Sequence, residues 1–78
     1  MRQALGDFAP GCRVTITGIV PGVPAVTARR LRDLGFAEGA EVEVVRRAPL
    51  RDPVLYRIRG YEVCLRRTEA AYLLARLG

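Results

Sequence analysis

Residues 30–44 read R-L-R-D-L-G-F-A-E-G-A-E-V-E-V, and the spacing of the apolar side chains changes in the middle of this stretch. Up to Leu34 the apolar residues recur at helical spacing, which predicts a helix. Gly35 stands where a helix C-cap requires a positive φ, and the apolar Phe36 follows it. After Gly39 polar and apolar residues alternate, which is typical of a strand with one buried face. The stretch therefore predicts a helix, a tight turn and a half-buried strand.

Working outward, the helix is predicted over residues 25–34, and alternation predicts further strands over residues 13–20 and 54–59. Gly18 inside the first of these strands indicates a bend or a bulge. Residues 46–53 contain two prolines and three arginines and are typical of a loop. Four residues are expected in the core: Leu5, Phe8, Phe36 and Tyr56.

Antiparallel pairing of the two strands around this loop supports the interpretation. One register places apolar residues opposite each other and acidic residues opposite basic ones: Val42 with Ile58, Val44 with Tyr56, Glu43 with Arg57, and Glu41 with Arg59. A second hairpin is predicted through a two-residue type II′ loop, Gly60-Tyr61, because this turn prefers Gly first. Its register gives three further pairs: Ile58 with Val63, Tyr56 with Leu65, and Arg59 with Glu62.

The C-terminal residues predict a short helix over residues 69–77. Thr68 is a suitable N-cap, and Glu69 and Arg76 would lie near the helix ends that favour their charges. Apolar residues at helical spacing would dock this helix: Ala70, Leu73, Leu74 and Leu77. Four or five short strands with one inserted helix and this C-terminal helix predict a mainly β fold. We expect a single domain over residues 1–78, built as a small, partly open β-barrel.

Composition limits the function classes. A chain of 78 residues buries only roughly 60% of the surface that it exposes when unfolded, so its core is thin. All 13 basic residues are arginine, and with 8 acidic residues the net charge is +5. The sequence contains no His, Ser or Lys, which excludes His acid–base chemistry and Ser or Lys nucleophiles. We therefore expect no enzymatic activity and no catalytic residue.

The two cysteines, Cys12 and Cys64, belong to no C-x-x-C motif, and a tetrahedral zinc site would need carboxylates to complete it. We expect two reduced thiols, no metal site and no cofactor. Fe(II) or Zn(II) binding by a monomer, lost when both cysteines are changed, would instead indicate transition-metal binding.

The N-terminus lacks an apolar run, and no apolar segment approaches the length of a membrane span. We expect a soluble cytoplasmic protein.

Eight arginines form a basic surface: Arg29, Arg30, Arg32, Arg46, Arg47, Arg51, Arg66 and Arg67. Such a surface is consistent with nucleic-acid binding, with attraction to an anionic membrane or an acidic partner, or with solvated charge alone. Aromatic residues that could stack on bases are few, and only Tyr61 is expected to be exposed. This scarcity favours solvated charge over nucleic-acid binding.

The loop A-P-L-R-D-P at residues 48–53 is a second candidate binding region. Its prolines pre-order the backbone, which lowers the entropic cost of presenting Leu50 and Arg51 to a partner. A rigid connection without any partner explains the same composition equally well.

Several motifs together resemble the FeoA family, the small cytoplasmic accessory proteins of bacterial ferrous-iron uptake. They are R-R-L-R-D-L-G-F-A-E-G-A-E-V-E-V at residues 29–44, A-P-L-R-D-P-V at residues 48–54, the Arg59-Gly60 turn, and V-C-L-R-R-T-E-A at residues 63–70. With the lead-in L-G-D-F-A-P-G, the resemblance extends over essentially the whole chain. It implies an SH3-like β-barrel, which agrees with the strand pairing above.

The resemblance also implies a partner, FeoB, the membrane Fe(II) transporter with a cytoplasmic GTP-binding domain. The chain would bind FeoB, modulate its transport or GTP hydrolysis, and stay peripheral to the inner membrane through that partner. The family provides no catalytic or metal residues to carry over, and no nucleic acid is expected. The barrel also resembles the C-terminal domain of diphtheria-toxin-repressor-type regulators. The alternative is therefore a nucleic-acid-binding barrel or a module associated with a metal-dependent regulator.

We expect the partner to contact the inserted helix and the loop, through Arg29, Arg30, Leu31, Arg32, Pro49, Leu50, Arg51, Asp52 and Pro53. Leu31 also fits the core, so a polar substitution there would act through misfolding. Three glycines are expected in structural turns: Gly35, Gly39 and Gly60. Pairing of an edge strand with a second copy, which would give a homo-oligomer, stays open.

Overall fold

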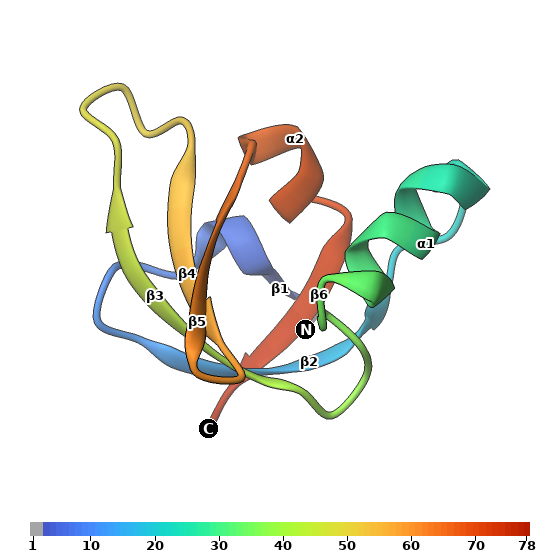
Figure 1. Cartoon of the computed structure of the whole chain (residues 1–78), viewed down its shortest axis with the longest axis horizontal. Helices are drawn as coiled ribbons and strands as arrows, with labels where there is room; N and C mark the ends of the chain where they lie inside the picture. The colour runs from blue at the N-terminus through green and yellow to red at the C-terminus, as the bar shows by residue number, and fades with distance from the viewer. Residues whose placement is uncertain (1–2) are drawn as a thin grey trace.

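The computed structural model describes residues 3–78, which form one rolled sheet with helical segments between its strands (Figure 1). The strands are β1 (Gln3–Ala4), β2 (Arg13–Ile19), β3 (Glu41–Arg47), β4 (Val54–Ile58), β5 (Tyr61–Leu65) and β6 (Leu73–Leu77). The helical segments are the 3-10 turn η1 (Leu5–Asp7), the helix α1 (Ala25–Asp33) and the single-turn helix α2 (Arg67–Ala70). The prediction of a mainly β fold with an inserted helix is confirmed.

All strand pairs are antiparallel, in the order β1-β6-β2-β3-β4-β5. The molecule measures 29 × 27 × 25 Å, so the six-stranded sheet curves around its core and is not flat. Within residues 3–78 no ladder joins β5 to β1, which leaves the barrel partly open as predicted. The bend predicted at Gly18 is present as a shift in the β2–β6 register between Ile16 and Gly18.

The core lies inside this roll and contains every residue that the sequence placed there. Leu5 and Phe36 are completely buried, and Phe8 is nearly so. Tyr56 is also completely buried, and its ring meets that of Phe36 edge to face with centroids 6.2 Å apart. Among residues 3–78, no charged side chain is buried. Burial of apolar area therefore supplies the main stabilising term of the fold.

The end of α1 is the feature that the sequence predicted most closely. The N–H of Gly35 donates to the carbonyl of Arg32 at 2.9 Å, and that of Phe36 donates to the carbonyl of Leu31 at 3.0 Å. These two bonds form a Schellman motif, which requires a left-handed residue, and Gly35 has a φ of 109°. Gly39 and Gly60 also have positive φ values, and both lie in turns between regular elements.

The predicted β3–β4 register is confirmed for three pairs: Val42 with Ile58, Glu43 with Arg57, and Val44 with Tyr56. The expected pair of Glu41 and Arg59 is wrong, because β4 ends at Ile58 and Arg59 lies in the following turn. The predicted start of the loop at Arg46 is also wrong. A register shift after Val44 lets β3 continue to Arg47, which pairs with Val54.

The predicted β4–β5 hairpin is correct in its strands but wrong in its register. The turn residues are Arg59 and Gly60, with φ values of 53° and 83°, and two positive values are typical of a type I′ turn. The cross-strand pairs are therefore Ile58 with Tyr61, Arg57 with Glu62, Tyr56 with Val63, and Val54 with Leu65. The error is a shift of two residues. Because side chains alternate with a period of two, this shift leaves each side chain on its predicted face.

The predicted C-terminal helix is wrong over most of its length. It is limited to α2, with Arg66 and not Thr68 at the N-cap position, and the chain then enters β6. β6 lies between β1 and β2, where it completes the backbone hydrogen bonding of both strands. Ala70 and Leu73 are buried as expected, but Leu77 is 62% exposed at the end of β6.

Candidate partner-binding surface

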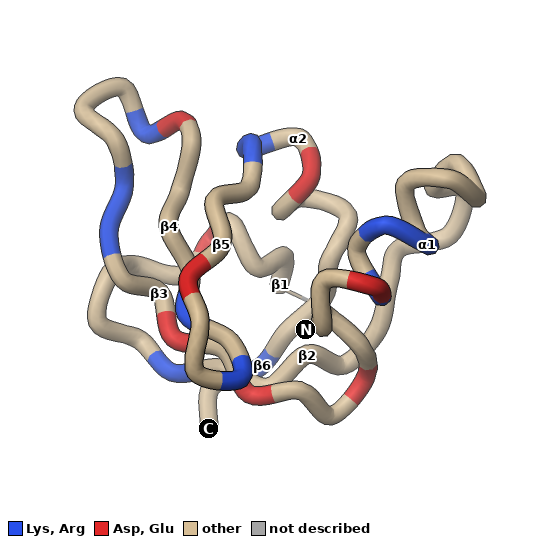
Figure 2. Tube along the Cα trace, viewed as in Figure 1, with Lys and Arg blue, Asp and Glu red and all other residues tan. Residues whose placement is uncertain are grey.

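The two regions expected to bind a partner lie on either side of α2. The β3–β4 connection and α2 occupy one end of the barrel, and α1 lies on the other side of α2 (Figure 1). Figure 2 shows basic residues in the connection, in α1 and next to α2, together with acidic residues in the same segments. The structure therefore makes α2 the link between two regions that are distant in sequence.

Polar contacts attach both regions to α2. The Asp52 carboxylate in the β3–β4 connection accepts a hydrogen bond from the Arg67 N–H at 3.1 Å. The Glu69 carboxylate forms an ion pair with the Arg30 guanidinium of α1 and accepts the Arg66 N–H at 3.0 Å. One turn of helix thus positions both predicted binding regions.

On α1 the arginines expected at the surface are exposed, but Leu31 is not. The side chain of Leu31 is 0% exposed and belongs to the core, so it cannot contact a partner. This finding corrects the expectation that Leu31 belongs to the binding surface. Arg29 and Arg32 are exposed, and the first turn adds Val26, whose side chain is 81% exposed.

The loop presents most of its predicted contact residues to solvent. The exposed residues are Pro49, Leu50, Arg51 and Asp52, and Pro53 is half-buried. Leu50 is 88% exposed, the largest value among the exposed large apolar residues of the described chain. The N–H of Ala48 donates to the carbonyl of Pro53 at 3.0 Å, and that of Arg51 donates to the carbonyl of Ala48 at 2.7 Å. These bonds order the loop, so less entropy is lost when a partner binds Leu50.

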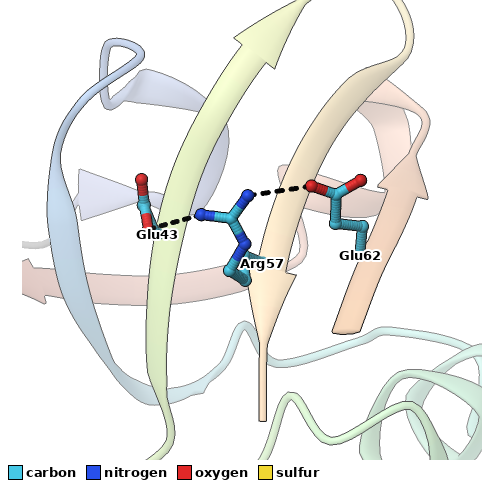
Figure 3. Close-up of polar contacts among 3 residues, drawn as sticks. All are labelled: Glu43, Arg57 and Glu62. Carbon is cyan, nitrogen blue, oxygen red and sulfur yellow. Dashed lines mark hydrogen bonds and ion pairs between the residues drawn. The ribbon is translucent and has the colours of Figure 1, made fainter. Parts of the chain in front are cut away.

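A second polar feature crosses the outer face of the sheet. Arg57 on β4 binds Glu43 on β3 at 3.1 Å and Glu62 on β5 at 2.9 Å (Figure 3). The hydrogen bond with Glu62 and then the charge of Glu43 raise the pKa of Arg57. An open groove of about 460 Å³ beside this chain of contacts is lined by Arg13 and Arg57 and by Glu41 and Glu43. Its opposite charges balance, so the groove favours ions of neither sign.

The remaining titratable side chains are scattered over the described part of the chain. Over residues 3–78 the structure contains no group of three or more His, Cys, Asp or Glu side chains that could hold a metal ion. Cys12 is half-buried and Cys64 is exposed, and both are free thiols. Burial raises the pKa of the Tyr56 phenol to about 12, against a smaller lowering effect of Arg47. In the described part of the chain, no helix is long and apolar enough to cross a membrane.

Residues 3–77 match the FeoA domain family. The chain belongs to the FeoA domain family. This family is associated with ferrous iron transport, and its match extends over nearly the whole chain.

Solved FeoA structures share the fold. An FeoA-like protein from Clostridium acetobutylicum is 32% identical with a TM-score of 0.87, over 97% of this chain and 86% of that one. FeoA of Stenotrophomonas maltophilia, solved in complex with zinc and described as an SH3 domain protein, is 27% identical with a TM-score of 0.77. That match covers 95% of this chain and 89% of the other. The SH3-like fold is therefore confirmed.

A longer relative joins such a domain to a transporter. The Fe(2+) transport protein A/Fe(2+) transporter FeoB fusion protein of Porphyromonas gingivalis (strain ATCC BAA-308 / W83) is 52% identical over 46 residues. These residues are 59% of this chain but only 6% of the fusion protein. The FeoA domain of the present chain thus corresponds to a small part of that relative.

The links through α2 were not predicted from the sequence. The hydrogen bond between Asp52 and Arg67 joins residues 15 apart, and the ion pair between Arg30 and Glu69 joins residues 39 apart. Pairs so distant leave no periodic pattern. Glu69 was recognised only as a helix-end charge, because its partner on α1 depends on how the barrel closes.

Proposed function

We propose that this chain is a non-enzymatic accessory domain of ferrous-iron uptake that binds the cytoplasmic part of an FeoB-type transporter. On this proposal it acts in the cytoplasm and modulates iron transport or GTP hydrolysis by its partner. The fusion of a similar domain with FeoB in one polypeptide is the observation that carries the proposal. Fusion keeps two domains at a high effective concentration, which is useful when they act on each other.

The proposed contact surface comprises the exposed face of α1 and the tip of the β3–β4 connection. It combines the arginines Arg29, Arg30 and Arg32 with the exposed apolar side chain of Leu50. Arginine is among the residues that are enriched at the energetic hot spots of protein interfaces. Burial of the exposed Leu50 side chain against a partner would remove apolar area from water. The contacts through α2 support a single continuous surface, because they hold both parts in place before a partner arrives.

Binding to the purified cytoplasmic domain of the transporter tests the proposal. The domain should bind the wild-type chain at physiological salt, and excess random oligonucleotide should not displace it. Leu50→Ser and Arg29→Gln should each weaken binding by about tenfold or more, since single interface anchors contribute 1–2 kcal/mol or more. Arg76→Gln on β6 removes the same charge elsewhere and should have little effect.

Two results would contradict the proposal. The first is binding to the oligonucleotide alone, with an affinity that falls steeply with salt, because this is the behaviour of a nucleic-acid-binding barrel. The second is no binding to the cytoplasmic domain or to the full-length transporter in membranes, measured with chains that retain the wild-type thermal midpoint. GTP hydrolysis by the transporter, measured with and without the chain, then shows whether binding modulates the partner.

A further inference from the structure

A small recess is lined by residues of the β3–β4 connection and of the elements beside it. The β3–β4 connection and α2 lie at the same end of the barrel (Figure 1). The volume of the recess is about 70 Å³. Three arginines from three different segments line it: Arg47 at the end of β3, Arg51 in the loop and Arg67 at the start of α2. The rest of the lining is neutral and consists of Gly6 and Val54. The fold thus gathers three positive charges around one small space.

None of these three arginines forms an ion pair within the described residues. The ion pairs within residues 3–78 involve only Arg30 and Arg57 among the arginines. The Asp52 carboxylate accepts a hydrogen bond from the backbone N–H of Arg67, and it forms no ion pair with the guanidinium of that residue. The recess therefore holds an excess of positive charge, unlike the balanced groove beside Arg57.

One of the three arginines is fixed in place before any ligand binds. The Arg47 guanidinium donates to the Phe8 carbonyl at 3.0 Å and is partly buried. A guanidinium has five N–H donors, so several remain for a ligand in the recess. Arg51 and Arg67 are exposed and can turn their side chains toward the same space. A preordered donor of this kind lowers the entropic cost of binding.

We propose that this recess binds a phosphate group. Guanidinium groups match the geometry of phosphate oxygens through paired N–H donors, and charge-assisted hydrogen bonds of this type are strong. The volume corresponds to about two water molecules in the liquid, which suits one tetrahedral oxyanion. Phosphate binding can be measured without the transporter, although Arg51 also belongs to the loop that is proposed to contact it.

The phosphate has two sources with the same chemistry, a free phosphate or the headgroup of a phospholipid. The structure supplies a way to separate them. Leu50 is next to Arg51, is 88% exposed and does not line the recess. An exposed leucine beside arginines is suited to insertion at an anionic membrane surface. Leu50→Ser should therefore weaken binding to vesicles while leaving binding of free phosphate unchanged.

Titration of the labelled protein with inorganic phosphate, followed by NMR at constant ionic strength, tests the site. The resonances of the three recess arginines and of Gly6 should shift saturably in the millimolar range. Arg51→Gln and Arg67→Gln should each raise the dissociation constant about tenfold, as expected for loss of one charge-assisted contact. Arg76→Gln is the matched control, because it removes the same charge outside the recess and should leave the constant unchanged.

Two outcomes of the titration would overturn the proposal. One is the absence of any saturable shift at these residues. The other is an equal effect of Arg76→Gln and Arg51→Gln, which would mean that phosphate responds only to net charge. Vesicles containing phosphatidylglycerol then identify the source: binding that depends on both Arg51 and Leu50 supports a lipid headgroup. Phosphate binding in the recess without vesicle binding supports free phosphate.

Discussion

The hydroxyl of Tyr56 is buried without a hydrogen-bond partner among the described residues, and its removal should stabilise the protein. The residue is 0% exposed and packs against Phe36. An unsatisfied buried donor costs about 1–3 kcal/mol, because the group has lost its hydrogen bonds to water. Tyr56→Phe deletes this group and retains the ring. We expect the free energy of unfolding to rise by about 1–2 kcal/mol at neutral pH.

Tyr61→Phe is the matched comparison, because the same atom is removed from a hydroxyl that is bonded. Tyr61 donates to the carbonyl of Leu34 at the end of α1. Its loss should lower the free energy of unfolding by about 0.5–1.5 kcal/mol, the usual net value of one such bond. Identical chemical changes in one small domain should therefore have opposite signs.

The pH dependence of Tyr56→Phe gives a second, independent signal. Burial raises the pKa of Tyr56 from 10.0 to about 12, so the folded state retains the proton that the unfolded state loses. Below pH 10 the phenol is protonated in both states, so its ionisation does not change the stability of the wild-type protein. As the pH rises from 10 toward 12, the free energy of unfolding of the wild-type protein falls, because only the unfolded state releases this proton. Two pH units correspond to about 2.7 kcal/mol. The advantage of the phenylalanine variant should therefore grow over this range by up to that amount.

Urea denaturation at neutral pH and between pH 10 and 12 measures both effects, and thermal scans should show a rise of about 4–8 °C per kcal/mol. A variant that is less stable than wild type by 1 kcal/mol or more would refute the reasoning, because it would mean that the hydroxyl is hydrogen-bonded. A pH-independent difference between the two proteins would refute the assignment of the raised pKa to burial.

Three further predictions follow from single contacts. Gly35→Ala should destabilise the chain by about 1–3 kcal/mol in urea denaturation, and by more than Gly39→Ala. Both positions have positive φ, but only at Gly35 would the new Cβ meet a core atom, at 3.3 Å from Ile58 Cδ1. Equal losses of unfolding free energy in the two variants would contradict this reasoning. Asp52→Ala should lower the free energy of unfolding by about 0.5–1.5 kcal/mol, and Asp52→Asn by less, because asparagine can still accept the Arg67 N–H. Arg57→Gln should reduce the thermal midpoint slightly at low salt and not at 1 M salt, where exposed ion pairs are screened; a salt-independent loss would indicate a packing role instead.

The parts of the fold that the sequence predicted are those determined by local chemistry. The helix end at Gly35 follows from a capping motif that is contained within six residues. The β3–β4 register follows from alternation together with opposite charges, because Glu43 and Arg57 must face each other when Val42 meets Ile58. For the candidate site, the exposure of the α1 arginines could be predicted from the helical spacing, and that of Leu50 from its place between two prolines in a loop.

The parts that were missed depend on where distant segments meet. A shift of two residues in the β4–β5 hairpin conserves every side-chain face, so alternation could not distinguish Arg59-Gly60 from Gly60-Tyr61 as the turn. The spacing of apolar residues after Ala70 suits a helix. These residues form β6 instead, because the backbone N–H and C=O groups of β2 must be hydrogen-bonded and β6 pairs with them. Leu31 could not be assigned to the core or the surface until the position of α1 on the barrel was known.

The sequence by itself therefore determined the fold class, the end of α1, one strand register and the basic character of the surface. Each of these depends on residues that are neighbours in the chain or on a period that neighbours share. Only the tertiary structure decided that α2 links the loop to α1, and that Arg47, Arg51 and Arg67 surround one recess. The physical reason is that rolling the sheet brings together side chains whose separation in sequence carries no information about their distance.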